Sequence, residues 1–315
     1  MLRLALALTL LCALPAHAFP AQRCMNLSNH LEPRADDAFH YLYAPHHIAL
    51  IAAEGFDTLR IPANVARHFS DGQIAPDFAA RLRTVIDLAQ VEDLFIILSL
   101  HNYDAIMEDP DAEAERFVAI WSALAEMFDD IPNEMAFELL NEPTGNLTNE
   151  VAEPLYTRAL AEIRARQPER WVLIGGAEKN SVRYIEQRPR VDDPRVVHTF
   201  HYYDPFNFTH QGATHLENPP PVGTHWGKAA DYELVKLRLR RAANHHTPTF
   251  LGEFGVFERA PRSDRPAFLS MVRKTAESHG IGWCHWGFGA GFGAFEPADN
   301  TWYDDIVEAL LDGSP

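Results

Sequence analysis

The chain has 315 residues, with 44 acidic against 27 basic side chains and a formal net charge of −17. Such a surface repels nucleic acid and anionic membranes, so it argues against both as partners and suits a neutral ligand. Three cysteines are too few for a disulfide scaffold, and the length is ordinary for one α/β barrel of roughly 250 residues or more.

Residues 1–18 have the pattern of a secretory signal peptide. One positive charge, Arg3, precedes an apolar stretch that ends in Ala16-His17-Ala18, a cleavage site of the A-x-A type. We therefore expect cleavage after Ala18, a single catalytic domain over residues 19–315, and a secreted or periplasmic protein. No later apolar run is long enough to span a bilayer.

Short apolar runs then alternate with helical patterns along the whole chain. The predicted strands are Arg23–Asn26, Thr58–Ile61, Phe95–Leu100, Met135–Leu140, Trp171–Gly175, Val196–Tyr202, Thr249–Gly252 and Gly282–Trp286. Between them apolar residues recur at helical spacing, as at Leu82, Val85, Ile86 and Ala89. This alternation predicts an α/β fold, a parallel sheet closed into a (β/α)8 TIM barrel. An open doubly wound sheet is the alternative, but it normally has a Gly-rich first turn, which residues 23–29 lack.

Two cysteines remain after Ala18. Cys24 and Cys284 fall in the first and last predicted strands, so barrel closure would make them neighbours. In an oxidising compartment they could form a disulfide, and two buried thiols are the other outcome.

Two glutamates follow apolar runs far apart in the chain. Glu142 lies in Leu140-Asn141-Glu142-Pro143, and Glu253 lies in Leu251-Gly252-Glu253-Phe254-Gly255. Each would emerge at the carboxyl end of a strand, and each alone is equally well explained as a turn residue. Together, two carboxylates held on rigid elements are what retaining glycoside hydrolysis requires, one as proton donor and one as nucleophile.

Other polar and aromatic residues stand at the same end of the predicted strands. They are Asn26, Arg60, His101, Asn141, His201, Tyr203 and Trp286. Each alone has an ordinary structural interpretation, such as an exposed arginine, a hydrogen-bonded histidine or a core tryptophan. Their joint placement at the carboxyl ends of the strands, where barrels build their sites, predicts an active site.

This series resembles glycoside hydrolase family 5 over nearly the whole mature chain. The resemblance implies retaining hydrolysis, with Glu142 as general acid/base and Glu253 as nucleophile. Glu142 would begin protonated, with its pKa raised by an apolar wall or by the second carboxylate. Arg60 and Tyr203 match the residues that hold the nucleophile, and Asn141 matches the one that bonds the sugar 2-hydroxyl.

The resemblance also implies contacts with the sugar chain. His101 and His201 match the two site histidines, one contacting the sugar and one near the acid/base. Trp286 matches the floor of the −1 subsite, and Asn26 is expected to contact the −2 sugar. Trp226, in the long loop 204–230, is a candidate stacking platform for the leaving-group sugars. One departure is Lys179, which stands where similar enzymes often place a tryptophan.

The resulting hypothesis is a secreted, monomeric endo-β-1,4-glucanase that cuts β-glucan polysaccharides or oligosaccharides without a metal or cofactor. A β-mannanase or β-1,3-glucanase with the same mechanism is the nearest alternative, and a non-catalytic glycan-binding barrel is another. The 16 histidines raise a metal-dependent hydrolase as a third, but no H-E-x-x-H spacing occurs in the sequence.

Overall fold

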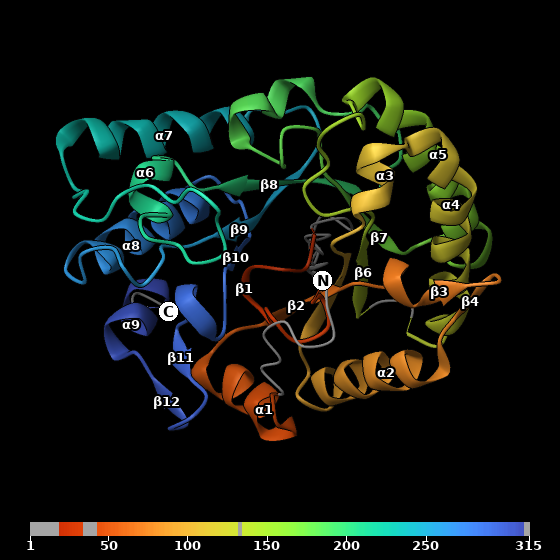
Figure 1. The fold of residues 1–315 in the computed structure, drawn as a ribbon, viewed down its shortest axis with the longest axis horizontal. Coiled ribbons are helices and arrows are strands. Elements are labelled where there is room, and N and C mark those ends of the chain that lie inside the picture. Colours follow the sequence, from red (N-terminus) through yellow and green to blue (C-terminus); the bar gives the residue numbers. More distant parts are fainter. Residues whose placement is uncertain (1–18, 34–42, 132–133, 312–315) are drawn as a thin grey trace, which may run out of the picture.

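A computed structural model describes residues 19–33, 43–131 and 134–311, and the predicted signal peptide lies outside this part. Eight parallel strands form a closed barrel in the order β1-β10-β9-β8-β7-β6-β5-β2 (Figure 1). The strands are β1 (Arg23–Asn26), β2 (Thr58–Ala63), β5 (Phe95–Leu100), β6 (Met135–Glu138), β7 (Trp171–Ile174), β8 (Val196–Tyr202), β9 (Thr249–Phe254) and β10 (Trp283–His285). The predicted (β/α)8 TIM barrel is therefore confirmed.

Helices surround the strands. They are α1 (Pro45–Glu54), α2 (Pro76–Val91), α3 (Asp104–Glu108), α4 (Pro110–Met127), α5 (Asn149–Arg166), α6 (Phe206–Thr209), α7 (Ala229–Ala243), α8 (Asp264–Ser278) and α9 (Asp304–Leu311), with 3₁₀ turns η1 (Ala66–His68), η2 (Val182–Gln187) and η3 (Ala290–Phe292). Two short hairpins, β3 (Phe69–Ser70) with β4 (Gln73–Ile74) and β11 (Phe295–Glu296) with β12 (Thr301–Trp302), lie outside the barrel. Proline opens α1, α2 and α4, where its missing N–H costs no helical hydrogen bond.

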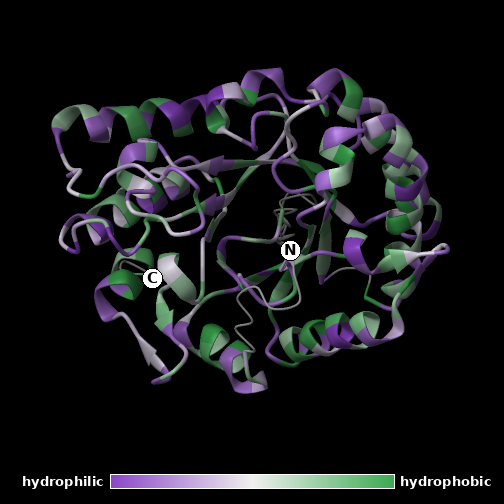
Figure 2. Ribbon diagram, in the orientation of Figure 1, coloured by the Kyte–Doolittle hydropathy of each residue, from purple (hydrophilic) through white to green (hydrophobic). Residues whose placement is uncertain are grey.

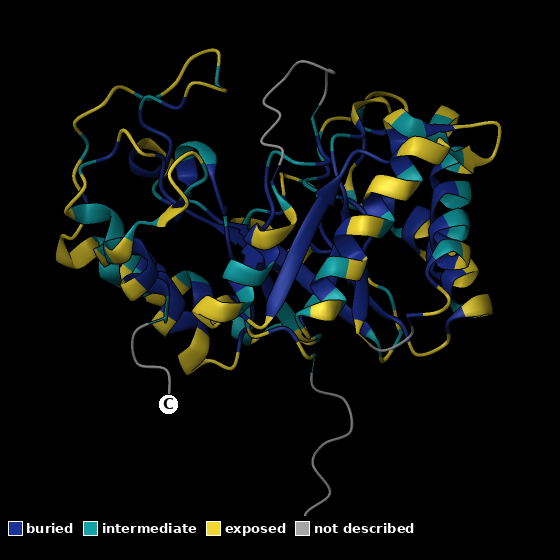
Figure 3. Ribbon diagram, turned by 90° about the horizontal axis from the view of Figure 1, so that it is seen from below, coloured by how far each residue is buried: buried dark blue, intermediate teal, exposed yellow. Residues whose placement is uncertain are grey.

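The strands are buried on both faces, as parallel strands under helices must be (Figure 3). The helices alternate hydrophobic and hydrophilic residues, with the apolar ones packed on the sheet (Figure 2). At the amino end of the barrel, small and branched side chains fill the interior, and Phe19 packs beneath them against Phe95, Trp171 and Phe250. Within the described residues no helix is both long and apolar enough to cross a membrane.

Barrel closure pairs β1 with β10 and places Cys24 opposite Cys284. The two form a disulfide, and both are fully buried. Of the two outcomes open from the sequence, the structure has the disulfide.

Two strands run further than predicted. β2 continues through Pro62 to Ala63, and β9 continues to Phe254, whereas β6 ends two residues earlier, at Glu138. Glu253 consequently lies within β9 and, like Arg60 within β2, pairs with a residue of a neighbouring strand.

Candidate active site

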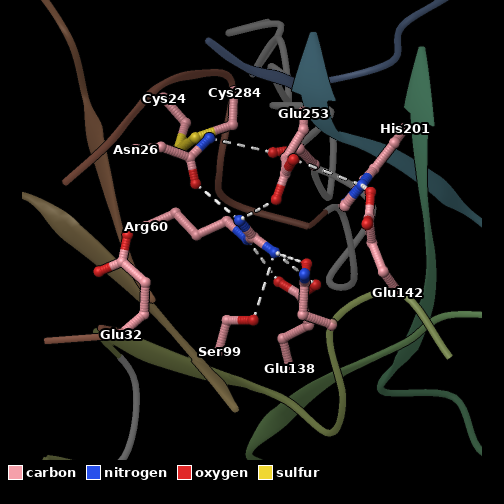
Figure 4. Close-up of polar contacts among 12 residues, drawn as sticks. Cys24, Asn26, Glu32, Arg60, Ser99, Glu138, Glu142, His201, Glu253 and Cys284 are labelled. Carbon is pink, nitrogen blue, oxygen red and sulfur yellow. Dashed lines mark hydrogen bonds and ion pairs between the residues drawn. A yellow bond between two sulfur atoms is a disulfide. The ribbon is translucent and has the colours of Figure 1, made fainter. Parts of the chain in front are cut away.

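Arg60 lies at the centre of the polar network at the carboxyl end of the barrel (Figure 4). Its guanidinium is fully buried on β2 and donates to both oxygens of Glu138, at 2.6 and 2.8 Å. Nη1 donates to Glu253 Oε1 at 2.9 Å and Nη2 to Asn141 Oδ1 at 2.9 Å. Glu138 and Glu253 raise the pKa of Arg60 above its ordinary value although burial acts against the charge, so this cation is permanent.

Glu253 is held by two donors. Besides Arg60, the Tyr203 hydroxyl donates to Oε2 at 3.0 Å, and His201 Nδ1 lies 3.5 Å from the same oxygen. The side chain is only 6% exposed. These contacts fix one rotamer and keep the carboxylate at the carboxyl end of the barrel, as a positioned nucleophile requires.

Glu142 follows β6 with a left-handed backbone, φ 48°, and is the more exposed of the two, at 31% of its side chain. Its Oε1 lies 2.9 Å from His201 Nδ1. One carboxylate oxygen of Glu142, one of Glu253 and one ring nitrogen of His201 all lie within 4.8 Å of one another. The two carboxylates thus stand about as close as the roughly 5–5.5 Å of retaining sites, and well short of the roughly 6.5–9.5 Å of inverting ones.

The pKa values of this pair are shifted in opposite directions. Burial raises the pKa of Glu253, and the negative charges of Glu142 and Glu138 add to this, against the charges of His201 and Arg60. Burial also acts to raise the pKa of Glu142, but the hydrogen bond and charge of His201, with Lys179 and Arg60, hold it below its ordinary value. The expectation of a raised pKa for Glu142 is therefore wrong for the free site, because His201 contacts this carboxylate directly.

Aromatic side chains gather at the carboxyl end of the barrel. Trp286 is partly exposed, and its ring lies parallel to that of the buried His101, with centroids 6.0 Å apart. Tyr203 and Phe292 meet edge to face beside them. A partly exposed indole face of this kind suits the apolar C–H face of a sugar.

Two predicted sugar contacts are corrected by the structure. Asn26 is fully buried, donates through Nδ2 to the carbonyls of Gly252 and His285, and accepts from Arg60, so it supports the site from beneath. Trp226 is 6% exposed because its loop folds back onto α8, where its ring packs on Phe268 and its backbone N–H donates to Asp264. It has no face free for stacking.

In the same loop, Phe206 has an exposed aromatic ring. It is 46% exposed and stacks on His210, with centroids 4.1 Å apart. Burial lowers the pKa of His210 to about 3, so this histidine is neutral at ordinary pH.

Sequence reasoning missed Glu138 and Ser99. Both are fully buried partners of Arg60, from β6 and β5. A signal did exist, because a glutamate inside the apolar run Met135–Leu140 must find a cation once the strand is buried.

Glu142, His201 and Glu253 are also the one group of converging metal-ligand side chains in the described residues. Arg60 and Tyr203 already donate to the two oxygens of Glu253, and the guanidinium adds a fixed positive charge 2.9 Å away. This donor set fits an acid–base pair better than a resident cation.

A family model, Cellulase (glycosyl hydrolase family 5), matches residues 35–291. The chain belongs to glycosyl hydrolase family 5. Members of this family hydrolyse with retention, in agreement with the carboxylate spacing. The predicted family is thereby confirmed.

Several similar proteins are named endoglucanases. Endoglucanase H of Acetivibrio thermocellus is 31% identical over 281 residues, which cover 86% of this chain and 30% of that protein. A hyperthermophilic endo-β-1,4-glucanase solved with substrate has a TM-score of 0.89 at 32% identity, over 92% of this chain and 96% of the other. Cel5A of Thermotoga maritima, solved with cellobiose and with mannotriose, has a TM-score of 0.88 at 31% and 30% identity, over 92% of this chain and 97% of the other. The chain thus spans less than a third of Endoglucanase H.

Proposed function

We propose that this protein is a secreted, retaining endo-β-1,4-glucanase with Glu253 as nucleophile and Glu142 as acid/base. The observation that carries the proposal is the convergence of the two carboxylates within 4.8 Å, with Glu253 bound by Arg60 and Tyr203 and Glu142 bound by His201. The A-x-A site at Ala18 supports export.

The proposed reaction is a double displacement. Glu253 attacks the anomeric carbon of the −1 sugar while Glu142 gives its proton to the departing oxygen, which leaves a glycosyl ester on Glu253. Glu142 then takes a proton from water, which attacks the same carbon and releases the sugar and the carboxylate. Asn141 is fixed by Arg60 beside Glu142, in a position to bond the sugar 2-hydroxyl.

Trapping the covalent intermediate tests the assignment. A 2-deoxy-2-fluoro cellobioside with a dinitrophenol leaving group should label the protein once, and peptide mapping by mass spectrometry should find the sugar on Glu253. Glu253→Gln should lose labelling and turnover but keep cello-oligosaccharide binding. A label on another residue, or turnover by Glu253→Gln, would refute the nucleophile assignment.

A matched test addresses Glu142. Glu142→Ala should still react with an aryl cellobioside whose leaving group needs no proton, and azide should rescue its second step as a β-glycosyl azide. An α-configured azide product would contradict retention.

The sugar specificity needs a separate assay. Endoglucanase names among the relatives support β-1,4-glucan, and the mannotriose complex of Thermotoga maritima Cel5A supports β-mannan as a second candidate. Reducing-end release from barley β-glucan, carboxymethylcellulose, glucomannan and laminarin separates them. Cleavage of laminarin or mannan alone would overturn the glucanase proposal.

A further inference from the structure

Lys179 lies in the loop that follows β7, directly against the loop that carries Glu142. Its backbone N–H donates to the carbonyl of Pro143, the residue after Glu142, at 3.1 Å. The next residue, Asn180, is fully buried and accepts at 2.7 Å from the backbone N–H of His201, the partner of Glu142. Lys179 is therefore fixed between the acid/base and its histidine, while its own side chain is exposed.

The backbone directs this side chain away from the packed interior. Glu178, Lys179 and Asn180 have φ angles of 62°, 57° and 53°, three successive left-handed residues that fold the loop tightly. Left-handed backbone is unfavourable for a residue with a long side chain, so no local conformational preference explains a lysine here.

The other basic groups near Glu142 are paired or neutral. Arg60 and His201 contact Glu253 and Glu142, and burial lowers the pKa values of His210 and His215. In the described part of the chain, the ammonium of Lys179 makes no hydrogen bond or ion pair. Its charge nevertheless reaches the site, since it helps to lower the pKa of Glu142.

The backbone position of Lys179 beside Glu142 also bears on the leaving group. Glu142 gives its proton to the oxygen of the departing chain, so residues fixed beside Glu142 adjoin the sugars on that side. In a β-1,4-glucan the bond broken is at C1 of the −1 sugar, so the departing chain is the half that contains the reducing end.

We propose that Lys179 selects glucan chains that carry a carboxylate in the leaving-group half, such as a uronosyl unit or an aldonic acid at the reducing end. The inference rests on the proposed glucanase function and specifies its substrate class. With a net charge of −17 the protein repels anionic chains at long range, so the preference has to come from a local contact.

Cellotetraose and its aldonic acid, cellotetraonic acid, test this directly. They differ only at the reducing-end unit, which in the acid is an open-chain gluconate with a carboxylate, and the quantity measured is the ratio of kcat/KM for the acid to that for the neutral sugar. The ring opening is common to every variant, so only a change of this ratio between variants reports on the charge. An exposed ion pair predicts that Lys179→Met lowers this ratio about two- to fivefold, and that about 0.5 M salt removes most of the difference. Because both substrates use the same Glu142, an altered pKa of the acid/base cancels in the ratio.

Three further variants test whether the charge of Lys179 sets this ratio. Lys179→Arg should keep the ratio, Glu178→Gln should raise it by removing the adjacent negative charge, and Lys236→Met, on the far exposed face of α7, should leave it unchanged. The ratio of rates on carboxymethylcellulose and hydroxyethylcellulose distinguishes carboxylates along the chain from those at its end.

If Lys179→Met lowered kcat/KM equally for the acid and for the neutral sugar, the inference would be overturned, because Lys179 would then bond ordinary hydroxyls. An unchanged ratio would overturn it too. Failure to cut either tetrasaccharide or either cellulose derivative would instead reject the glucanase proposal, so the two failures are distinguishable.

Discussion

At the residue scale, a single guanidinium pairs with two buried carboxylates. Arg60 donates to Glu138 through two hydrogen bonds and to Glu253 through one. Glu138 is fully buried, whereas Glu253 keeps a small exposed fraction. Glu138 therefore holds Arg60 in place, and Arg60 in turn holds the proposed nucleophile, an arrangement that no single strand could provide.

Glu138→Gln should weaken this arrangement without changing its shape. Breaking a buried ion pair costs roughly 3–5 kcal/mol, and the loss should be smaller here because Glu253 still faces Arg60. The charge of Glu138 helps to raise the pKa of Glu253, so its removal should lower that pKa and move the acidic limb of the kcat/KM profile to lower pH.

Urea unfolding and the pH profile measure the two effects. Glu126→Gln, which breaks an exposed pair with Arg166, is the matched control and should change stability by less than about 1 kcal/mol. An acidic limb that moves to higher pH in Glu138→Gln would contradict the electrostatic coupling.

Glu142 gives a second prediction at this scale. It must be protonated to act, yet in the free site His201 holds its pKa below the ordinary value. A bound sugar covers the exposed third of this side chain and removes water from it, which raises the pKa of a carboxyl. The alkaline limb should therefore lie at higher pH for kcat, which reports the complex, than for kcat/KM, which reports the free enzyme.

The measurement is a pair of pH profiles on one cello-oligosaccharide. Coincident alkaline limbs would show that substrate does not change the pKa of Glu142. In His201→Gln the limb of kcat/KM should move to higher pH, since the partner that lowers the pKa of Glu142 is weakened.

At the element scale, the strands and their order could be predicted because each strand is a short apolar run between helical patterns. Glu142, Glu253 and Arg60 could be placed at one face for the same reason, since parallel strands present their carboxyl ends together. The burial of Trp226 could not be predicted, because it depends on contacts with Phe268 and Asp264 of α8 that form only when the loop folds. The burial of Asn26 likewise depends on β9 and β10.

The amino end of the barrel offers a test of element packing. The Phe19 ring lies 5.4–5.7 Å, centroid to centroid, from Phe250, Trp171 and Phe95, near the first residues of β9, β7 and β5. Phe19→Ala should lower the free energy of unfolding by roughly 1–3 kcal/mol, less than a fully buried phenylalanine loses because Phe19 is only partly buried. Chemical denaturation measures the loss, and Phe206→Ala, an exposed ring, should lose less than about 1 kcal/mol. Equal losses would contradict the packing role.

At the scale of the whole molecule, closure between β1 and β10 joins the two ends of the chain. Asn26 of β1 bonds to the carbonyl of His285 in β10 and accepts from Arg60. The pairing of β1 with β10 therefore helps to hold Arg60 in place as well as to close the barrel. The sequence placed both cysteines on the closing strands but left their state open, because a disulfide depends on the side-chain directions at one register. The structure sets Cys24 directly opposite Cys284.

This disulfide closes a loop of 260 residues and should matter mostly to global stability. Cys24→Ala with Cys284→Ala should cost roughly 2–5 kcal/mol, because the unfolded chain regains the entropy that the link removes. Denaturant unfolding should show a lower midpoint for the double variant, and a non-reduced digest of the unaltered protein should contain the two cysteine peptides joined. Separate peptides would rule out the disulfide, whereas joined peptides with an unchanged midpoint would mean that strand packing alone closes the barrel.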